Sequence, residues 1–306
     1  MTSGVYVPNI TFFTKEGDVD LKKTQAHMRW MIEKGVDGFF LTGSYGSNLL
    51  LSVDEKIRIY QIAAKLKEMY PSLQLIAHIY CPNMHDTIAC ALQARRVGIN
   101  SIASIPPIYY QFTKKDIMCY YETLIKSTGC EVYAYNNPKT TGVKMNYDMV
   151  VALQEIGLKG IKDSSLDVDF LRTLKFLRSN KENDFDIIIG SSTGWLAYYA
   201  LGFRTMISGM CNYAPEIIVE MYKACLEEDH GQAEMHYTRM LQLNRSMKKA
   251  DSVITSMLAL KARGFPDVYP RQPLSLYQHN DHLFKEIICE LQKVGISLND
   301  PFEEFF

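Results

Sequence analysis

The sequence predicts a closed (β/α)₈ barrel, the TIM-barrel architecture, followed by a C-terminal helical appendix. The chain has 306 residues, of which 47% are hydrophobic and 22% charged, a composition typical of a folded globular protein. Short runs rich in β-branched and aromatic residues alternate with longer amphipathic stretches, and eight such units can be counted. Eight βα units favour a closed barrel over an open, doubly wound sheet.

The candidate strands are short and fairly evenly spaced, as expected for parallel strands joined by helices. They are Gly4–Ile10, Gly38–Leu41, Gln74–Ile79, Ser101–Ile105, Glu131–Asn136, Gly160–Asp163, Asp186–Ile189 and Thr205–Ser208. Capping-box patterns predict that two of the intervening helices run from Ser52 to about Met69 and from Thr113 to about Ser127. Asn83 and Asn146 are placed to cap two more helices.

The chain continues beyond the eighth strand with more helical sequence than a barrel needs. The helical patterns there cover Pro215–Leu226, Gly231–Ala250, Val253–Ala262 and Asp281–Val294. We therefore expect one barrel domain at residues 1–225, which carries the active site, and a C-terminal helical extension at residues 226–306 packed on it.

Charge and patterning argue against several classes of partner. The net charge is −1, and the basic residues are scattered, so no electrostatic footprint for nucleic acid or anionic lipid is present. The longest apolar stretches are far shorter than the roughly 20 residues that cross a bilayer, and no signal-peptide pattern opens the chain. The seven cysteines and seven histidines show no metal-binding spacing. We expect a cytoplasmic protein with a small-molecule partner and no metal.

The sixth strand carries the first candidate for chemistry. Alternation places Lys162 on the same face as Gly160 and Leu158, with Lys159 and Asp163 on the opposite face. If that face is the barrel interior, burial lowers the pKa of Lys162 and favours the neutral amine, the nucleophile that attacks a ketone. The alternative is a lysine whose ammonium group reaches solvent at the strand end.

Other strand ends would share the same rim, because active sites of these barrels lie at the C-terminal ends of the strands. Tyr135 ends the fifth strand, the Tyr109–Tyr110 pair follows the fourth, and a glycine-punctuated loop containing Ser44 follows the second. The backbone N–H groups of such a loop can converge on a carboxylate. Each feature alone also fits ordinary packing or a βα turn. The glycine-rich Gly190–Gly194 segment keeps a phosphosugar isomerase barrel open.

Taken together, these residues resemble the dihydrodipicolinate synthase and N-acetylneuraminate lyase family of class I pyruvate-dependent aldolases. The resemblance spans nearly the whole chain. Its most specific parts are Tyr135-Asn136-Asn137-Pro138, followed by Thr141-Gly142, and then Gly160-Ile161-Lys162-Asp163. It implies a homo-oligomer, a dimer or a tetramer, that uses no metal or organic cofactor.

The resemblance also implies roles for the matching residues. Lys162 would form a Schiff base with a 2-oxo acid such as pyruvate, and Tyr135 would shuttle protons. Ser44 would take the relay position, and Tyr109 would match a tyrosine that family members lend across a dimer interface. Backbone N–H groups of Ser44 and Tyr45 would hold the pyruvate carboxylate. The substrate-binding positions would be Tyr45, Thr140, Gly190 and Ile207.

Departures from the family pattern concern the second substrate. Tyr45 stands where the family usually has a small hydroxyl residue, and Ser47 where it has an acidic one. Thr140 occupies the position of an arginine that binds a carboxylate in dihydrodipicolinate synthases, and a hydroxyl cannot supply that bidentate contact. Ser192 and Thr193 replace the acidic pair usual in sialate lyases.

We therefore expect a lyase that cleaves or forms a carbon–carbon bond of a 2-keto-3-deoxy sugar acid, with pyruvate and an aldehyde as partners. Dihydrodipicolinate synthase, N-acetylneuraminate lyase and a dehydratase that uses the same imine remain alternatives. Another alternative is a non-catalytic oxo-acid-binding paralogue in which Tyr45 and Ser47 disable the relay.

Overall fold

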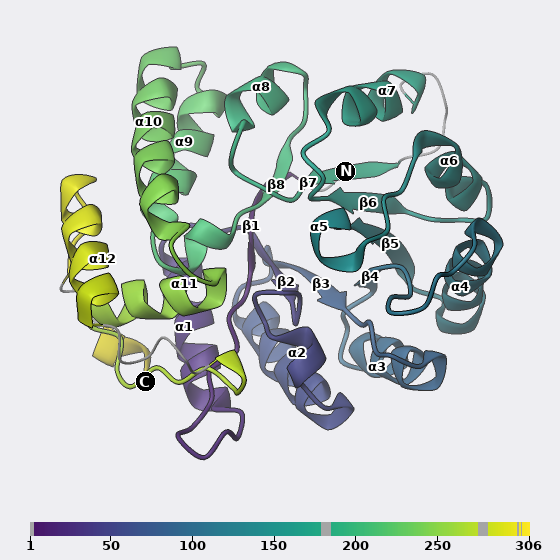
Figure 1. Cartoon of the computed structure of the whole chain (residues 1–306), viewed down its shortest axis with the longest axis horizontal. Coiled ribbons are helices and arrows are strands. Elements are labelled where there is room, and N and C mark those ends of the chain that lie inside the picture. Colours follow the sequence, from purple (N-terminus) through teal and green to yellow (C-terminus); the bar gives the residue numbers. More distant parts are fainter. Residues whose placement is uncertain (1–2, 179–184, 275–280, 299, 301) are drawn as a thin grey trace.

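Eight parallel strands close into one barrel in chain order, which confirms the predicted fold (Figure 1). The computed structural model describes residues 3–178, 185–274, 281–298, 300 and 302–306. The strands are β1 Gly4–Pro8, β2 Gly38–Leu41, β3 Gln74–His78, β4 Ser101–Ser104, β5 Glu131–Asn136, β6 Gly160–Asp163, β7 Asp186–Ile189 and β8 Thr205–Ile207. The barrel closes where β1 pairs with β8, with Val5 opposite Met206.

Helices follow the strands and cover the outside of the barrel (Figure 1). The two predicted capping boxes are present, because the side chains of Ser52 and Thr113 each accept a hydrogen bond from the backbone three residues on. Asn83 and Asn146 cap α3 and α6 in the same way. The helices are α1 Leu21–Glu33, η1 Asn48–Leu50, α2 Val53–Met69, α3 Met84–Arg96, α4 Lys114–Thr128, α5 Pro138–Thr141, α6 Tyr147–Glu155, α7 Val168–Arg178, α8 Trp195–Ala200, η2 Gly209–Asn212 and α9 Pro215–Leu226.

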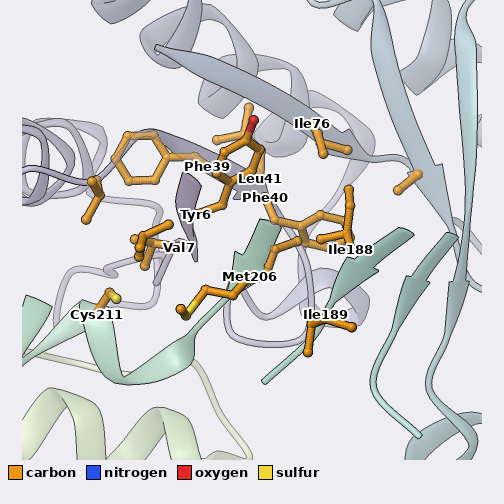
Figure 2. Packing of buried hydrophobic residues seen from close by; sticks show 14 of the residues in the cluster. Tyr6, Val7, Phe39, Phe40, Leu41, Ile76, Ile188, Ile189, Met206 and Cys211 are labelled. Atoms are coloured by element: carbon orange, nitrogen blue, oxygen red, sulfur yellow. The ribbon is translucent and has the colours of Figure 1, made fainter. Parts of the chain in front are cut away.

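The strands contribute side chains to one continuous hydrophobic cluster. Figure 2 shows part of this cluster, including Phe40 of β2 and Ile188 of β7. Both side chains are fully buried. Apolar surface removed from water stabilises a fold by about 25 cal/mol per Å², so this packing holds the strand ends, and the polar groups on them, in fixed positions.

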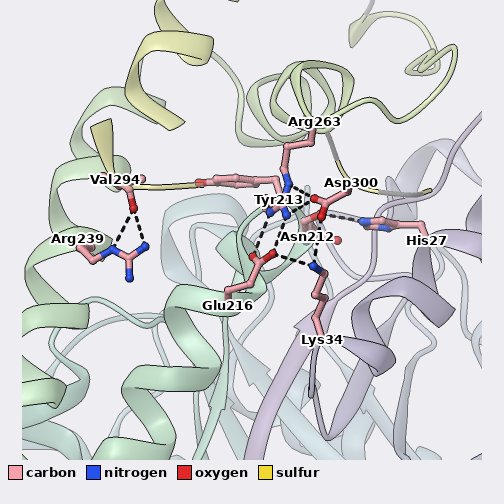
Figure 3. Close-up of polar contacts among 9 residues, drawn as sticks. All are labelled: His27, Lys34, Asn212, Tyr213, Glu216, Arg239, Arg263, Val294 and Asp300. Carbon is pink, nitrogen blue, oxygen red and sulfur yellow. Dashed lines mark hydrogen bonds and ion pairs between the residues drawn. The ribbon is translucent and has the colours of Figure 1, made fainter. Parts of the chain in front are cut away.

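The C-terminal appendix consists of α10 His230–Met247, α11 Ser252–Ala262, α12 Asp281–Lys293 and η4 Phe302–Phe305. Helix α10 packs on α9, and α12 packs on α10 and α11 (Figure 1). A buried arginine, Arg263, fastens the appendix by binding Glu216 of α9 and Asp300 near the C-terminus (Figure 3). The division into two folding units at residue 225 stays a prediction. In the described part of the chain, no helix is long and apolar enough to span a membrane.

Candidate active site

Lys162 lies inside the barrel near the C-terminal end of β6. The register pairs Lys162 with Tyr135 on β5, so both side chains point to the same face of the sheet. The Lys162 Nζ atom lies 3.6 Å from the centroid of the Phe40 ring and 3.8 Å from that of the Tyr135 ring. The side chain is buried, so the inward direction expected from alternation agrees with the structure.

Two aromatic rings, Phe40 and Tyr135, contact this amine, and the His78 ring packs against both of them. Phe40 and Tyr135 meet edge to face at 5.3 Å, and the His78 ring lies edge to face with Tyr135 at 5.7 Å. Burial lowers the pKa of His78 well below its ordinary value, and the charges of Lys56 and Lys162 lower it further. His78 is therefore neutral and adds no second charge beside Lys162.

The surroundings of Lys162 favour the neutral amine. Burial lowers the pKa of Lys162, and this effect outweighs the interaction with Tyr135, which raises it. Among the residues that the structure describes, no carboxylate forms an ion pair with Lys162. A neutral amine is the form that can attack a carbonyl carbon.

The Tyr135 hydroxyl has several polar neighbours. The Asn137 side-chain amide donates a hydrogen bond to it at 3.1 Å. Burial alone would raise the pKa of Tyr135, but the charge of Lys162 and hydrogen bonds with Ser44 and Ser164 lower it, and the net direction is downward. Tyr135 is thus easier to deprotonate than a free tyrosine. Such a phenol can carry a proton to and from a bound substrate.

A polar pocket of about 150 Å³ opens above this pair. Six of the eight residues predicted for the site line it: Ser44, Tyr45, Tyr135, Lys162, Gly190 and Ile207. Gly190 is needed there, since a Cβ atom at this position would lie 2.1 Å from the Ser164 Oγ atom. The remaining wall comes largely from the loop after β7 and from the segment after β8, with one residue, Asn244, from α10 in the appendix.

Tyr45 reaches from the loop after β2 towards the appendix. A Cβ atom at position 209 would lie 2.2 Å from the phenol ring, so Gly209 makes room for Tyr45. Burial raises the pKa of Tyr45, while a hydrogen bond with Ser252 of α11 acts in the opposite direction. The large side chain therefore narrows the pocket and joins the barrel rim to the appendix.

The other two predicted residues lie outside the pocket in the single chain. Tyr109 is 92% exposed and has a φ angle of 82°, in the left-handed region. Thr140 is exposed on α5, and its hydroxyl donates to the backbone oxygen of Asn137 at 3.3 Å. Their proposed roles stay predictions.

Sequence reasoning missed three residues at the site. Phe40 follows another phenylalanine on β2, so alternation of apolar and polar residues could not indicate which ring faces inward. His78 is the next-to-last residue of the predicted strand Gln74–Ile79 and the last residue of β3, and this position near a strand end was the available signal for it. Asn244 belongs to α10, 82 positions beyond Lys162 in the sequence, and only the packing of the appendix brings it to the pocket. No group of three metal-ligating side chains occurs among the described residues.

The model of the dihydrodipicolinate synthetase family matches residues 1–289. The chain belongs to this family. An uncharacterized DapA-like lyase of Halobacterium salinarum is 29% identical to it over 294 residues, which cover 96% of this chain and 94% of the relative. As a member of this family of aldolases and lyases, the chain is a lyase.

Two further proteins are similar to this chain over nearly its whole length. A 2-dehydro-3-deoxy-phosphogluconate/2-dehydro-3-deoxy-6-phosphogalactonate aldolase of Sulfurisphaera tokodaii is 26% identical over 294 residues, covering 95% of this chain and 96% of the relative. The structure of a Ruminococcus gnavus sialic acid aldolase, a catalytic lysine mutant, shares the fold with a TM-score of 0.87 and 21% identity, covering 99% of this chain and 98% of that one.

Proposed function

We propose that this family member cleaves or forms the C3–C4 bond of a 2-keto-3-deoxy sugar acid through a Schiff base on Lys162. One observation carries the proposal. The Lys162 amine is buried beside Tyr135, and no carboxylate of the described residues forms an ion pair with it. The named activity of the Sulfurisphaera tokodaii relative supports the same class of substrate.

In the proposed reaction the neutral Lys162 amine adds to the 2-oxo carbon, and loss of water gives a protonated imine. This imine accepts the electron pair of the C3–C4 bond while Tyr135 takes the proton of the 4-hydroxyl, so that an aldehyde leaves. The resulting enamine is protonated at C3, and water releases pyruvate and the free amine. Condensation follows the reverse course. Every step uses the substrate, water and side chains of this chain, and none calls for a metal or organic cofactor.

The loop after β2 would hold the pyruvate carboxylate. Its described hydrogen bonds use the N–H groups of Thr42, Ser47 and Asn48 as donors. Within the described chain, the N–H groups of Ser44 and Tyr45 have no acceptor, and both residues line the pocket. Free backbone N–H groups of a turn bind anions well. The Ser44 hydroxyl, which interacts with Tyr135, would complete the proton relay.

The exposed Tyr109 fits a homo-oligomer, a dimer or tetramer, in which one subunit would lend this side chain to its neighbour. The absence of an arginine at Thr140 argues against aspartate semialdehyde as the acceptor. The polar hydroxyl-bearing wall at Ser191, Ser192 and Thr193 supports a hydroxylated substrate instead.

Trapping with borohydride tests the proposal directly. Incubation with pyruvate and borohydride should add the mass of a reduced pyruvate imine to the peptide that contains Lys162, and Lys162→Ala should remove the adduct. A panel of 2-keto-3-deoxy acids, N-acetylneuraminate and a pyruvate plus aspartate semialdehyde reaction would then identify the substrate. A non-catalytic paralogue would form the adduct without exchanging the pyruvate methyl protons with deuterated water. Absence of an adduct would refute the Schiff base.

A further inference from the structure

The loop after β7 and helix α10 build one wall of the pocket with neutral hydrogen-bonding groups. The Asn244 amide donates to the Thr193 hydroxyl at 3.4 Å. The backbone N–H of Thr193 donates to the Ser191 hydroxyl at 3.0 Å, and the Ser208 hydroxyl donates to that of Ser192 at 3.1 Å. These contacts orient the wall before a substrate arrives.

Helix packing directs Asn244 to this wall. The neighbouring Leu243 and the residues one turn away on either side, Met240 and Met247, are buried in the hydrophobic core. Asn244 lies on the same side of α10, at the edge of this apolar stripe, where it is half-buried and lines the pocket. Because the helix is anchored by its apolar side, Asn244 holds a fixed position above the barrel mouth.

The pocket is almost uncharged. Among its described lining residues, Lys162 is the only lysine, arginine, aspartate or glutamate, and the proposed imine occupies it. A phosphate group is bound best by arginine, by lysine or by several converging N–H groups. The charge that acts on Tyr45 at the rim is that of the Asp251 carboxylate, which would repel a phosphate.

We propose that Asn244, together with Thr193, binds a hydroxyl on the aldehyde half of the substrate and selects an uncharged polyol chain over a phosphorylated one. The proposal rests on the proposed aldolase function. The Asn244 amide has one acceptor and two donor positions, and one donor is used by Thr193. A sugar hydroxyl both donates and accepts and so matches the amide, whereas a phosphate oxygen only accepts and meets the amide oxygen unfavourably.

The test compares kcat/KM for 2-keto-3-deoxygluconate and for its 6-phosphate. Wild-type enzyme should prefer the uncharged substrate by about tenfold or more. Asn244→Ala should lower kcat/KM for the uncharged substrate by about tenfold, the effect of one lost hydrogen bond, and leave the value for the phosphate nearly unchanged. Asn244→Lys should shift the preference towards the phosphate. Gln242→Ala, an exposed position on the same helix, is the matched control and should change neither value.

Two results would overturn the inference. One is an equal loss for both substrates in Asn244→Ala, which would indicate a structural role. The other is a wild-type preference for the phosphate. Borohydride trapping of pyruvate on the same variants separates this inference from the proposed function. A wild-type enzyme that forms no adduct fails the aldolase proposal itself, while an adduct with an unchanged substrate ratio fails only the role of Asn244.

Discussion

Two buried cations, Lys162 at the barrel mouth and Arg263 in the appendix, have opposite surroundings. The side chains are 3% and 1% exposed, and each lies over an aromatic ring, Phe40 for Lys162 and Trp30 for Arg263. Arg263 also donates to the two oxygens of Glu216 at 2.6 and 3.0 Å and to Asp300 at 2.6 Å (Figure 3). Lys162 has no such carboxylate in the described structure.

The presence or absence of carboxylate partners separates a structural basic side chain, Arg263, from a reactive one, Lys162. Burial of a charge is costly unless partners compensate for it. Glu216 and Asp300 compensate for Arg263, which remains charged and joins α9 to the end of the chain. Lys162 lacks that compensation, and its pKa is lowered, so the fold gives up stability at this point and shifts the amine towards its neutral form.

Replacing Lys162 should produce the largest effect on activity. Lys162→Met removes the amine that would form the imine, so we expect kcat/KM for cleavage to fall by roughly 10⁴-fold or more. The free energy of unfolding should not fall and should rise by about 1 kcal/mol, as is common when a strained functional group is removed. Enzyme assays and urea denaturation measure the two quantities.

The matched control for Lys162→Met is Lys159→Met, on the same strand segment but on its opposite face. This control should keep both activity and the borohydride adduct. An adduct that persists in Lys162→Met, or a loss of stability comparable to that of a core truncation, would contradict the contrast between the two cations.

Replacing Arg263 should have the opposite signature. Arg263→Ala leaves two carboxylates without their main partner, and we expect the free energy of unfolding to fall by about 3–5 kcal/mol. Protein that remains folded in the cold should still form the pyruvate adduct. Arg239→Ala removes hydrogen bonds to the backbone oxygen of Val294 and to the His236 ring, which are weaker contacts than the ion pairs of Arg263, and should cost about 1 kcal/mol. An equal loss of unfolding free energy in the two variants would show that the ion pairs of Arg263 contribute no more to stability than the hydrogen bonds of Arg239.

The sequence was sufficient to predict the barrel and the direction of Lys162. Strand runs, helix caps and the period-two pattern around Lys162 are local features, and they are retained when the chain folds. The partners of the two cations are not local. Glu216 and Asp300 lie 47 and 37 positions from Arg263.

The same limit applies to the candidate site. The match of Tyr135 with Lys162 follows from adjacent strands and could be anticipated. The orientations of Phe40 and His78 could not be anticipated, because they depend on how β2 and β3 are placed in the closed barrel. Asn244 required knowledge of how α10 packs. A sequence motif therefore predicts the reacting pair better than it predicts what surrounds that pair.

The smallest expected effect is a loss of folding stability at acidic pH, and it depends on Glu216. Burial raises the pKa of Glu216, but hydrogen bonds and charge from Arg263 lower it more, and the net pKa lies below the ordinary 4.5. The stabilisation is therefore complete above about pH 4.5 and is lost as the pH falls through the lowered pKa, because the unfolded chain binds the proton first. One such group changes the free energy of unfolding by at most about 1.4 kcal/mol per pH unit.

Glu216→Gln should flatten this acid slope, as followed by urea denaturation between pH 3 and 6, while Glu220→Gln, an exposed position on the same helix, should leave it unchanged. Lys162 acts in a different window. Its lowered pKa means that the folded state releases a proton before the unfolded chain does, so stability rises with pH between that pKa and about 10.5. Lys162→Met should therefore flatten only the alkaline slope. If either variant altered both slopes, the two cations would be coupled, and their separation into a structural and a reactive group would be wrong.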